Sequence, residues 1–267
     1  LFLALTMQAQ NPEECLSGFD KFICQNYQKV KTPNIAITHA VLLQKLNEII
    51  GKDPIFKTEQ VGYSFEKRSI NLIRIGNGEK KILLWSQMHG DEPTATLAIL
   101  DILDFIKQNK NRKEIKELFA KTELLFIPML NPDGSEKFSR RNAQGIDINR
   151  DALRLQTPEG RILKNIRDEY KPLFAFNLHD QSPYNSVGDS DRLAAIALLA
   201  PAFNRDKSDN DIRIRAKKLI VFINNLLQKY MPGKVSKYDD EFEPRAFGDN
   251  VQLWGSSTIL IESGGFK

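Results

Sequence analysis

The sequence predicts an α/β fold of three layers (α/β/α), with a mixed, mostly parallel central sheet and helices on both faces. Short continuous apolar runs, such as Lys81–Trp85 and Leu173–Leu178, alternate along the chain with segments of helical period. Strands that are buried on both faces show such runs, and their alternation with helices is typical of a sheet covered on both sides. Neither a repeat nor a linker interrupts this pattern, so we expect one domain over residues 11–267.

In the first third of the chain, one helix and one hairpin precede the first buried strand. Thr38 is a favourable N-cap residue for a helix through Val41–Ile50, and Gly51 is its expected stop. Residues 55–75 alternate between apolar and polar, with Glu66-Lys67 between the two halves, which predicts a hairpin closed by the turn Gly76–Gly78.

The remaining elements follow in alternation. Proline is favoured in the first turn of a helix, and Pro93 and Pro158 stand at two of the expected starts. The expected helices are Glu92–Asn109, Arg112–Ala120, Pro158–Tyr170 and Asp209–Tyr230, and the expected strands are Lys81–Trp85, Leu124–Leu130, Leu173–Leu178, Ala194–Ala200 and Thr258–Ile261.

Composition excludes several classes of protein. The 267 residues carry 38 Lys+Arg against 34 Asp+Glu, a net charge of +4, and the basic residues occur in pairs such as Arg140-Arg141 rather than in runs. We therefore expect no nucleic-acid partner. Every apolar stretch falls short of the 18 or so residues that span a bilayer, so we expect no membrane insertion.

The N-terminal residues bear on the compartment. Residues 1–10 resemble the end of a secretory signal peptide cleaved after Ala9, although an apolar strand or helix fits them equally. We expect a secreted or periplasmic protein, with the cytoplasm as the alternative. Cys15 and Cys24 could pair in an oxidising compartment, and the absence of a CxxC motif argues against a zinc ribbon or a thioredoxin-type site.

Polar side chains gather directly after the predicted buried strands. In α/β sheets ligands bind beyond the carboxyl ends of the strands, so these positions define the candidate site. They are His89-Gly90-Asp91-Glu92, Asn131-Pro132-Asp133-Gly134, Arg140 to Arg150, His179-Asp180 and Glu262.

This inventory suits one Zn²⁺ ion. Catalytic zinc takes three imidazole or carboxylate ligands and keeps a fourth position open. His89 and Glu92, three residues apart at a helix entrance, share one side, and His179 completes the set from another strand. The pattern is not HExxH, so the general base must come from elsewhere, and Glu262 is the candidate. Each piece alone also has a structural explanation, such as a helix cap or a core histidine.

In combination and order, these residues resemble the zinc carboxypeptidases of the carboxypeptidase A type. That family carries HxxE, then NPDG, then an arginine ahead of a G-[IV]-D-x-N-R stretch, then a histidine after a strand and a late glutamate. The matching residues span 81–262: His89/Glu92, Asn131–Gly134, Arg140, Gly145–Arg150, His179 and Glu262.

The resemblance implies a role for each matching residue. His89, Glu92 and His179 would hold zinc. Glu262 would exchange the proton between water and the leaving amine, and Arg140 would stabilise the oxyanion.

The same resemblance places the substrate. Asn149 and Arg150 would grip the free carboxylate of a peptide. Asp147 is expected to orient a ligand, and Asp180 to lie at the rim.

The chain departs from the family pattern at two points. The family covers its substrate with a tyrosine about twenty residues before the glutamate, and Tyr238, 24 residues before Glu262, is the one tyrosine in that window. It fits a surface tyrosine as well. The family domain also continues with at least one more helix, whereas this chain stops five residues after Glu262, so we expect it to be truncated at the C-terminus.

The expected activity is removal of the C-terminal residue from peptides. The alternatives are a zinc amidohydrolase of the aspartoacylase type, which deacylates N-acyl amino acids, and a non-catalytic peptide-binding descendant. By position, residues 246–257 should line the pocket for the terminal side chain. There Asp249 could attract a basic residue, although a turn-capping role for Asp249-Asn250 is the stronger expectation.

Overall fold

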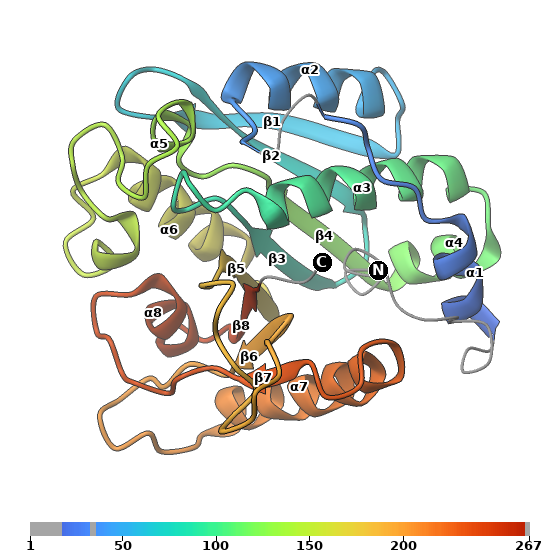
Figure 1. The fold of residues 1–267 in the computed structure, drawn as a ribbon. Coiled ribbons are helices and arrows are strands. Elements are labelled where there is room, and N and C mark those ends of the chain that lie inside the picture. The colour runs from blue at the N-terminus through green and yellow to red at the C-terminus, as the bar shows by residue number, and fades with distance from the viewer. Residues whose placement is uncertain (1–17, 33–35, 265–267) are drawn as a thin grey trace.

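A computed structural model describes residues 18–32 and 36–264. Its centre is an eight-stranded sheet in the order β1-β2-β4-β3-β5-β8-β6-β7 (Figure 1). The strands are β1 Phe56–Tyr63, β2 Ser69–Gly76, β3 Lys80–Trp85, β4 Thr122–Ile127, β5 Phe174–Asp180, β6 Ile196–Leu199, β7 Val235–Lys237 and β8 Ser257–Ser263.

The middle of the sheet is parallel and its margins are mixed. Strands β4, β3, β5 and β8 run parallel to their neighbours in that order. The pairs β1–β2, β2–β4 and β6–β8 are antiparallel, and β7 lies parallel to β6 at the edge. The predicted mixed, mostly parallel sheet is therefore confirmed, and the carboxyl ends of four central strands lie at one edge.

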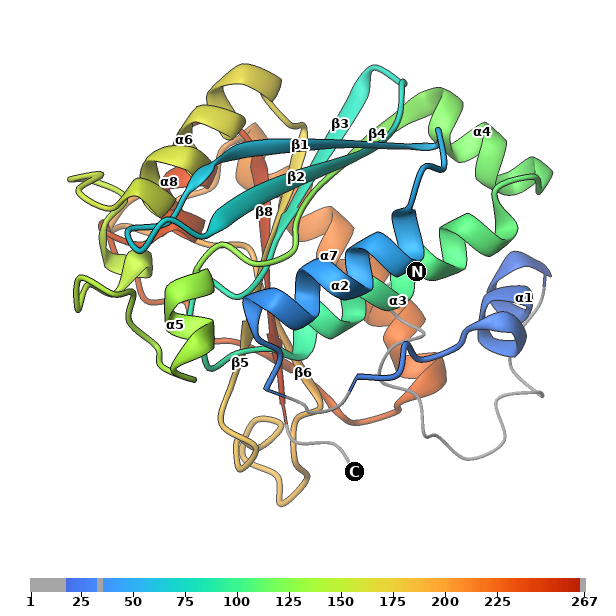
Figure 2. The ribbon, with the colours of Figure 1, turned by 90° about the horizontal axis from the view of Figure 1, so that it is seen from above.

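Helices cover both faces of the sheet (Figure 2). One apolar cluster joins one face to α2, α3, α4 and α7, and a second cluster joins the other face to α6 and α8. The helices are α1 Gly18–Asn26, α2 His39–Ile50, α3 Thr94–Asn109, α4 Lys113–Lys121, α5 Pro132–Glu136, α6 Pro158–Tyr170, α7 Asp211–Tyr230 and α8 Phe247–Leu253, with a 3₁₀ turn at Ile148–Arg150.

The predicted caps explain where α2 begins and ends. The Thr38 side chain accepts a hydrogen bond from the backbone N–H of Val41, and Gly51 follows the last turn with φ of 51°. A positive φ costs glycine little, which is why it stops a helix so readily.

The start of α3 differs from the prediction. The helix begins at Thr94 rather than at Glu92, and its cap comes from a distant strand. Asp180, at the end of β5, accepts hydrogen bonds from the Thr94 backbone N–H at 3.2 Å and from its Oγ1 at 2.8 Å. Glu92 therefore precedes the helix and lies in the connecting loop.

The hairpin prediction holds for its two strands, but the closing turn was wrong. The β1–β2 turn is closed by the backbone hydrogen bond from Ser64 to Arg68, with Lys67 at φ of 67°. Gly76–Gly78 instead leads from β2 into β3. A Cβ at Gly78 would lie 1.9 Å from the carbonyl carbon of Lys121, so the glycine is required by close backbone approach.

Four short elements were not predicted: α1, α5, α8 and β7. The strand expected at 124–130 ends at Ile127, and the strand expected at 194–200 spans Ile196–Leu199. Residues 128–130 remain buried because the chain keeps bonding to the loop after β3, where Leu130 donates to the carbonyl of Ser86.

Among the described residues, no helix is both long and apolar enough to cross a membrane. Residues 1–10 and Cys15 lie outside the described ranges, so the signal-peptide and disulfide predictions stay predictions.

Candidate metal centre and active-site cavity

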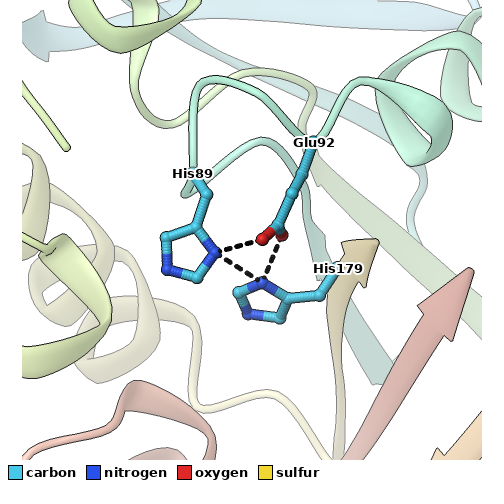
Figure 3. Close-up of side chains that lie close together, drawn as sticks. All are labelled: His89, Glu92 and His179. Carbon is cyan, nitrogen blue, oxygen red and sulfur yellow. Dashed lines mark hydrogen bonds and ion pairs between the residues drawn. The ribbon is translucent and has the colours of Figure 1, made fainter. Parts of the chain in front are cut away.

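Three of the predicted ligands converge on one point (Figure 3). His89 and Glu92 come from the loop between β3 and α3, and His179 comes from the carboxyl end of β5. The Nδ1 atoms of the two histidines lie 3.1 Å apart, and each lies 2.7 Å from a carboxylate oxygen of Glu92. Both histidines are buried, and in the described part of the chain this is the group of side chains that could hold a metal ion.

The protonation of His89 is set by a fourth residue. Its Nε2 atom lies 3.1 Å from Oδ1 of Asp147, so the ring donates its N–H to that carboxylate. The Nδ1 atom faces Glu92 and His179, so it is the nitrogen that would bind a metal ion after losing its proton. A carboxylate behind the far nitrogen of a histidine is the usual support of a zinc ligand. Two imidazole nitrogens and one carboxylate, oriented in this way, fit zinc.

The charge of Glu92 is favoured by its surroundings. Burial opposes ionisation, but the imidazoles of His179 and His89 hold the pKa of Glu92 well below its usual value. The backbone N–H of Asp180 also donates to Glu92 Oε2 at 3.2 Å. The carboxylate is therefore ionised, as a metal ligand must be.

The NPDG turn holds the loop that carries His89. Asn131 caps the turn by accepting from the backbone N–H of Gly134 at 2.9 Å, and its Nδ2 atom donates to the carbonyls of Met88 at 3.2 Å and Arg140 at 3.4 Å. One amide thus joins the residue before His89 to the predicted oxyanion-stabilising residue.

Asp133 of the same NPDG turn contacts the β1–β2 turn. Its carboxylate accepts from Ser64 Oγ at 2.6 Å, from Arg68 Nη1 at 2.7 Å and from the backbone N–H of Glu66 at 2.9 Å. These contacts fasten the β1–β2 turn to α5. The motif therefore supports the site without lying in it.

Glu262 lies next to the ligand group. It occupies the carboxyl end of β8, and the parallel register pairs it with His179 on β5. Burial raises the pKa of Glu262 to about 7, and the carboxylates of Glu92 and Asp180 act in the same direction. A carboxylate of that pKa can exchange protons near neutral pH.

Arg140 faces the same centre. Its Nε donates to Asp147 Oδ2 at 3.0 Å, and its Nη1 lies 3.2 Å from His89 Nδ1 and 3.3 Å from Glu92 Oε1. The side chain is 45% exposed, so it borders the open side of the group. A guanidinium there can stabilise negative charge that develops beside the ligands.

These residues line one cavity of about 330 Å³. Asn149 and Arg150 lie in its wall and are fixed from behind. Asn149 Oδ1 accepts from the backbone N–H of Phe247 at 2.9 Å, and Arg150 Nε lies 3.3 Å from a carboxylate oxygen of Glu243. The cavity thus brings together all seven predicted site residues.

The cavity also contains residues that the sequence analysis left open or missed. Tyr238 lines it, and burial together with the carboxylates of Glu262 and Glu92 raises the pKa of its phenol. Asn177 lies in the wall, two residues before His179 on β5, a spacing that places both on one face of the strand. Asp180, assigned only to the rim, lines the cavity and also caps α3.

Asp249 reaches the cavity from the first turn of α8. It accepts a hydrogen bond from the backbone N–H of Glu243 at 3.2 Å, so the carboxylate ties the loop before α8 to the helix and does not cap a turn as predicted. Burial raises the pKa of this carboxyl to about 7.

The chain is similar in sequence to known carboxypeptidases. Residues 42–186 match the model of the zinc carboxypeptidase family, a range that contains the three ligands but ends before Glu262. Carboxypeptidase 2 of Trichophyton rubrum is 31% identical over 144 residues, which cover 52% of this chain and 26% of that protein. The chain therefore spans about a quarter of the length of this curated relative.

The fold is shared with solved bacterial structures. A metallo-carboxypeptidase from Burkholderia cenocepacia superposes with a TM-score of 0.65 at 16% identity, covering 85% of this chain and 59% of that chain. A metallo-carboxypeptidase from Pseudomonas aeruginosa, in complex with (2-guanidinoethylmercapto)succinic acid, superposes with a TM-score of 0.61 at 20% identity. The superposition covers 85% of this chain and 59% of that chain. At such identity the likeness is one of fold.

Proposed function

The chain belongs to the zinc carboxypeptidase family, and we propose that it removes the C-terminal residue from peptides by zinc-dependent hydrolysis. One observation carries the proposal. The buried group of His89, Glu92 and His179 opens into the same cavity as a carboxylate of raised pKa, Glu262, and an arginine, Arg140.

His89, Glu92 and His179 would hold one Zn²⁺ ion, with Asp147 keeping the His89 proton on Nε2. When bound there, zinc supplies a Lewis acid that polarises the scissile carbonyl and lowers the pKa of water to about 7. The protein residues perform the remaining steps.

Glu262 acts as the proton carrier in this proposal. With a pKa of about 7 it takes a proton from the attacking water and returns it to the nitrogen of the leaving amine. Arg140 donates to the oxygen of the tetrahedral intermediate, since its guanidinium lies beside the ligand group.

The opposite part of the cavity wall would bind the substrate terminus. Arg150 offers two parallel N–H donors to a carboxylate, and the Asn149 amide adds another, because its oxygen is already used by the backbone of Phe247. The succinic acid bound by the Pseudomonas relative is a carboxylate ligand of the same kind.

The test combines metal analysis with a substitution. We expect about one zinc per chain in both wild type and Glu262→Gln, because Glu262 is not a ligand. On a blocked dipeptide with a free C-terminus, Glu262→Gln should lower kcat by roughly a hundredfold or more. Glu241→Gln, which changes an exposed carboxylate of the cavity mouth, serves as the matched control.

Two results would contradict the proposal. Cleavage of N-acyl amino acids without cleavage of the dipeptide would indicate the amidohydrolase alternative. Zinc content well below one per chain, together with peptide binding, would indicate a non-catalytic descendant.

A further inference from the structure

We propose that the ion pair between the buried Arg213 and the partly exposed Asp240 positions the loop 238–243 at the mouth of the cavity and thereby sets the affinity for the peptide substrate. The inference rests on the proposed function, because the loop borders the cavity of that site. Arg213 and Asp240 belong to none of the sequence motifs, and both lie beyond the family match, which ends at residue 186.

Every residue of the loop but one lines the cavity. Tyr238, Asp239, Glu241, Phe242 and Glu243 all line it, and Asp240 does not. The Asp240 carboxylate is turned to α7, where it meets Arg213. The residue that does not line the cavity is thus the one that anchors the loop.

Arg213 is built to hold that carboxylate in one place. Its side chain is 1% exposed, and Nη2 donates to the two oxygens of Asp240 at 2.7 and 2.8 Å. Nε donates to the carbonyl of Ala200 at 3.2 Å, and Nη1 donates to the carbonyls of Lys207 and Ser208. A planar guanidinium with this many fixed contacts cannot turn, so the position of Asp240 is fixed with it.

The other fastenings of the loop lie at its two ends. At one end the Tyr238 backbone N–H donates to the carbonyl of Leu198 at 3.0 Å. At the other end the Glu243 backbone N–H donates to Asp249. Among the described residues, no backbone hydrogen bond of 239–242 supports the stretch between them. Arg213 therefore supplies the anchor in the middle of the loop.

Loss of this anchor should act on binding more than on chemistry. The ligand group, Glu262 and Arg140 belong to other elements and keep their contacts. If the loop occupies its present position only part of the time, the apparent affinity falls by that fraction. A change of this kind raises KM and leaves kcat nearly unchanged.

The simpler explanation is that the Arg213–Asp240 pair only stabilises the fold. A second arginine–carboxylate pair, far from the cavity, distinguishes this explanation from a role in positioning the loop. Arg74 on β2 donates to Glu123 at 2.8 and 2.6 Å. In this pair the acid is buried and the arginine is partly exposed, and Glu123 stands at the amino end of β4, the opposite end from the cavity. Arg213→Lys and Arg74→Lys both keep the positive charge and remove the fixed fork of donors.

The experiment uses the zinc-loaded full chain with a blocked dipeptide. We expect Arg213→Lys to raise KM about tenfold with kcat within about twofold of wild type, and Arg74→Lys to leave both constants unchanged at a comparable drop in Tm. Hydrogen–deuterium exchange at the hydrogen-bonded amides of Tyr238 and Glu243 should be faster in Arg213→Lys and unchanged in Arg74→Lys. Asp240→Asn, which keeps the shape of the side chain, should shift KM in the same direction.

An unchanged KM and unchanged exchange in Arg213→Lys, or an equal rise of KM in Arg74→Lys, would overturn the inference while the wild type remains active. A wild type that binds zinc and cleaves no peptide would instead contradict the proposed function. In that case the exchange measurement still reports whether Arg213 holds the loop.

Discussion

His89 and Asp147 lie 3.1 Å apart, measured from Nε2 to Oδ1, although 58 residues separate them in the sequence. The contact keeps the proton on the outer nitrogen of the ring and leaves the inner nitrogen for a metal. Asp147 holds a second position as well, because its other oxygen accepts from Arg140 Nε at 3.0 Å. One carboxylate thus orients a ligand and the predicted oxyanion-stabilising residue.

We expect Asp147→Ala to weaken zinc binding by roughly 10- to 100-fold, as is typical when the partner of a ligating histidine is removed. Titration against a competing chelator measures this directly. Asp239→Ala, at the exposed mouth of the same cavity, is the control and should keep the wild-type affinity. Equal affinities in wild type and Asp147→Ala would show that the contact does not orient the ligand.

Gly90 is required by the way the ligand loop packs on the NPDG turn. A Cβ at this position would lie 2.0 Å from the carbonyl carbon of Gly134 and 2.3 Å from the nitrogen of Ser135. Gly90→Ala should therefore displace the loop that carries His89. We expect the free energy of unfolding to fall by about 1–3 kcal/mol and zinc binding to weaken. Urea unfolding and chelator competition measure the two effects.

The control for Gly90→Ala is Gly188→Ala. Gly188 has φ of 55°, but a Cβ at this position would meet no other atom within 4 Å. The variant should lose about 1 kcal/mol from backbone strain and keep its zinc affinity. If the two variants behaved alike, close packing at Gly90 would not be what positions the ligand.

Asp249 should make stability depend on pH. Its pKa is about 7 in the folded chain and near 3.8 ordinarily, because burial disfavours the charged form. Between about pH 4 and 7 the unfolded chain releases the proton while the folded chain keeps it, so stability falls as pH rises through this window. Above about pH 7 the folded chain has also released this proton, so the decrease in stability is complete and does not change further with pH.

Asp249→Asn has no carboxyl group to ionise at this position, so it lacks this decrease in stability with rising pH. Relative to wild type, the variant should gain roughly 4 kcal/mol of unfolding free energy between pH 4 and pH 8, from a shift of about three pKa units. Guanidinium unfolding of both proteins across this range tests the prediction, and Asp239→Asn controls for loss of a carboxylate. A difference between Asp249→Asn and wild type that does not vary with pH would contradict it.

The same carboxylate should favour a basic terminal residue. Asp249 shares the cavity with the apolar side chains of Leu199 and Leu260, which suit the aliphatic part of lysine while the carboxylate meets its ammonium group. We expect Asp249→Asn to lower kcat/KM by about tenfold for a lysine-ended peptide at pH 8 and to spare a phenylalanine-ended one. Equal effects on the two peptides would mean that Asp249 only holds the backbone of Glu243.

Much of the site could be predicted because its residues follow a local rule. His179 and Glu262 stand at the carboxyl ends of continuous apolar strands, and His89 follows a third. In a parallel arrangement these ends meet at one edge of the sheet, so order along the chain was enough to bring them together. Helix starts marked by capping residues, such as Thr38, were predictable for the same reason.

The elements that the sequence did not predict, such as α8 and β7, are not marked by a local pattern of this kind. Asp249-Asn250 were expected to cap a turn, yet they lie in α8, because the helix gains its stability by packing Phe247 and Val251 into the core. Strand β7 has only three residues and exists because β6 offers it an edge. Tertiary packing overrode local preference in both cases.

The sequence alone therefore determined the order of the elements and was enough to predict the metal ligands, through apolar periodicity and residue types at strand ends. The tertiary structure decided which distant groups support them. Asp180 caps α3, Asp147 orients His89, and Arg213 anchors Asp240. Such contacts join residues that are far apart in the chain and carry no local pattern, because the free energy of a buried polar group depends on the partner that folding brings to it.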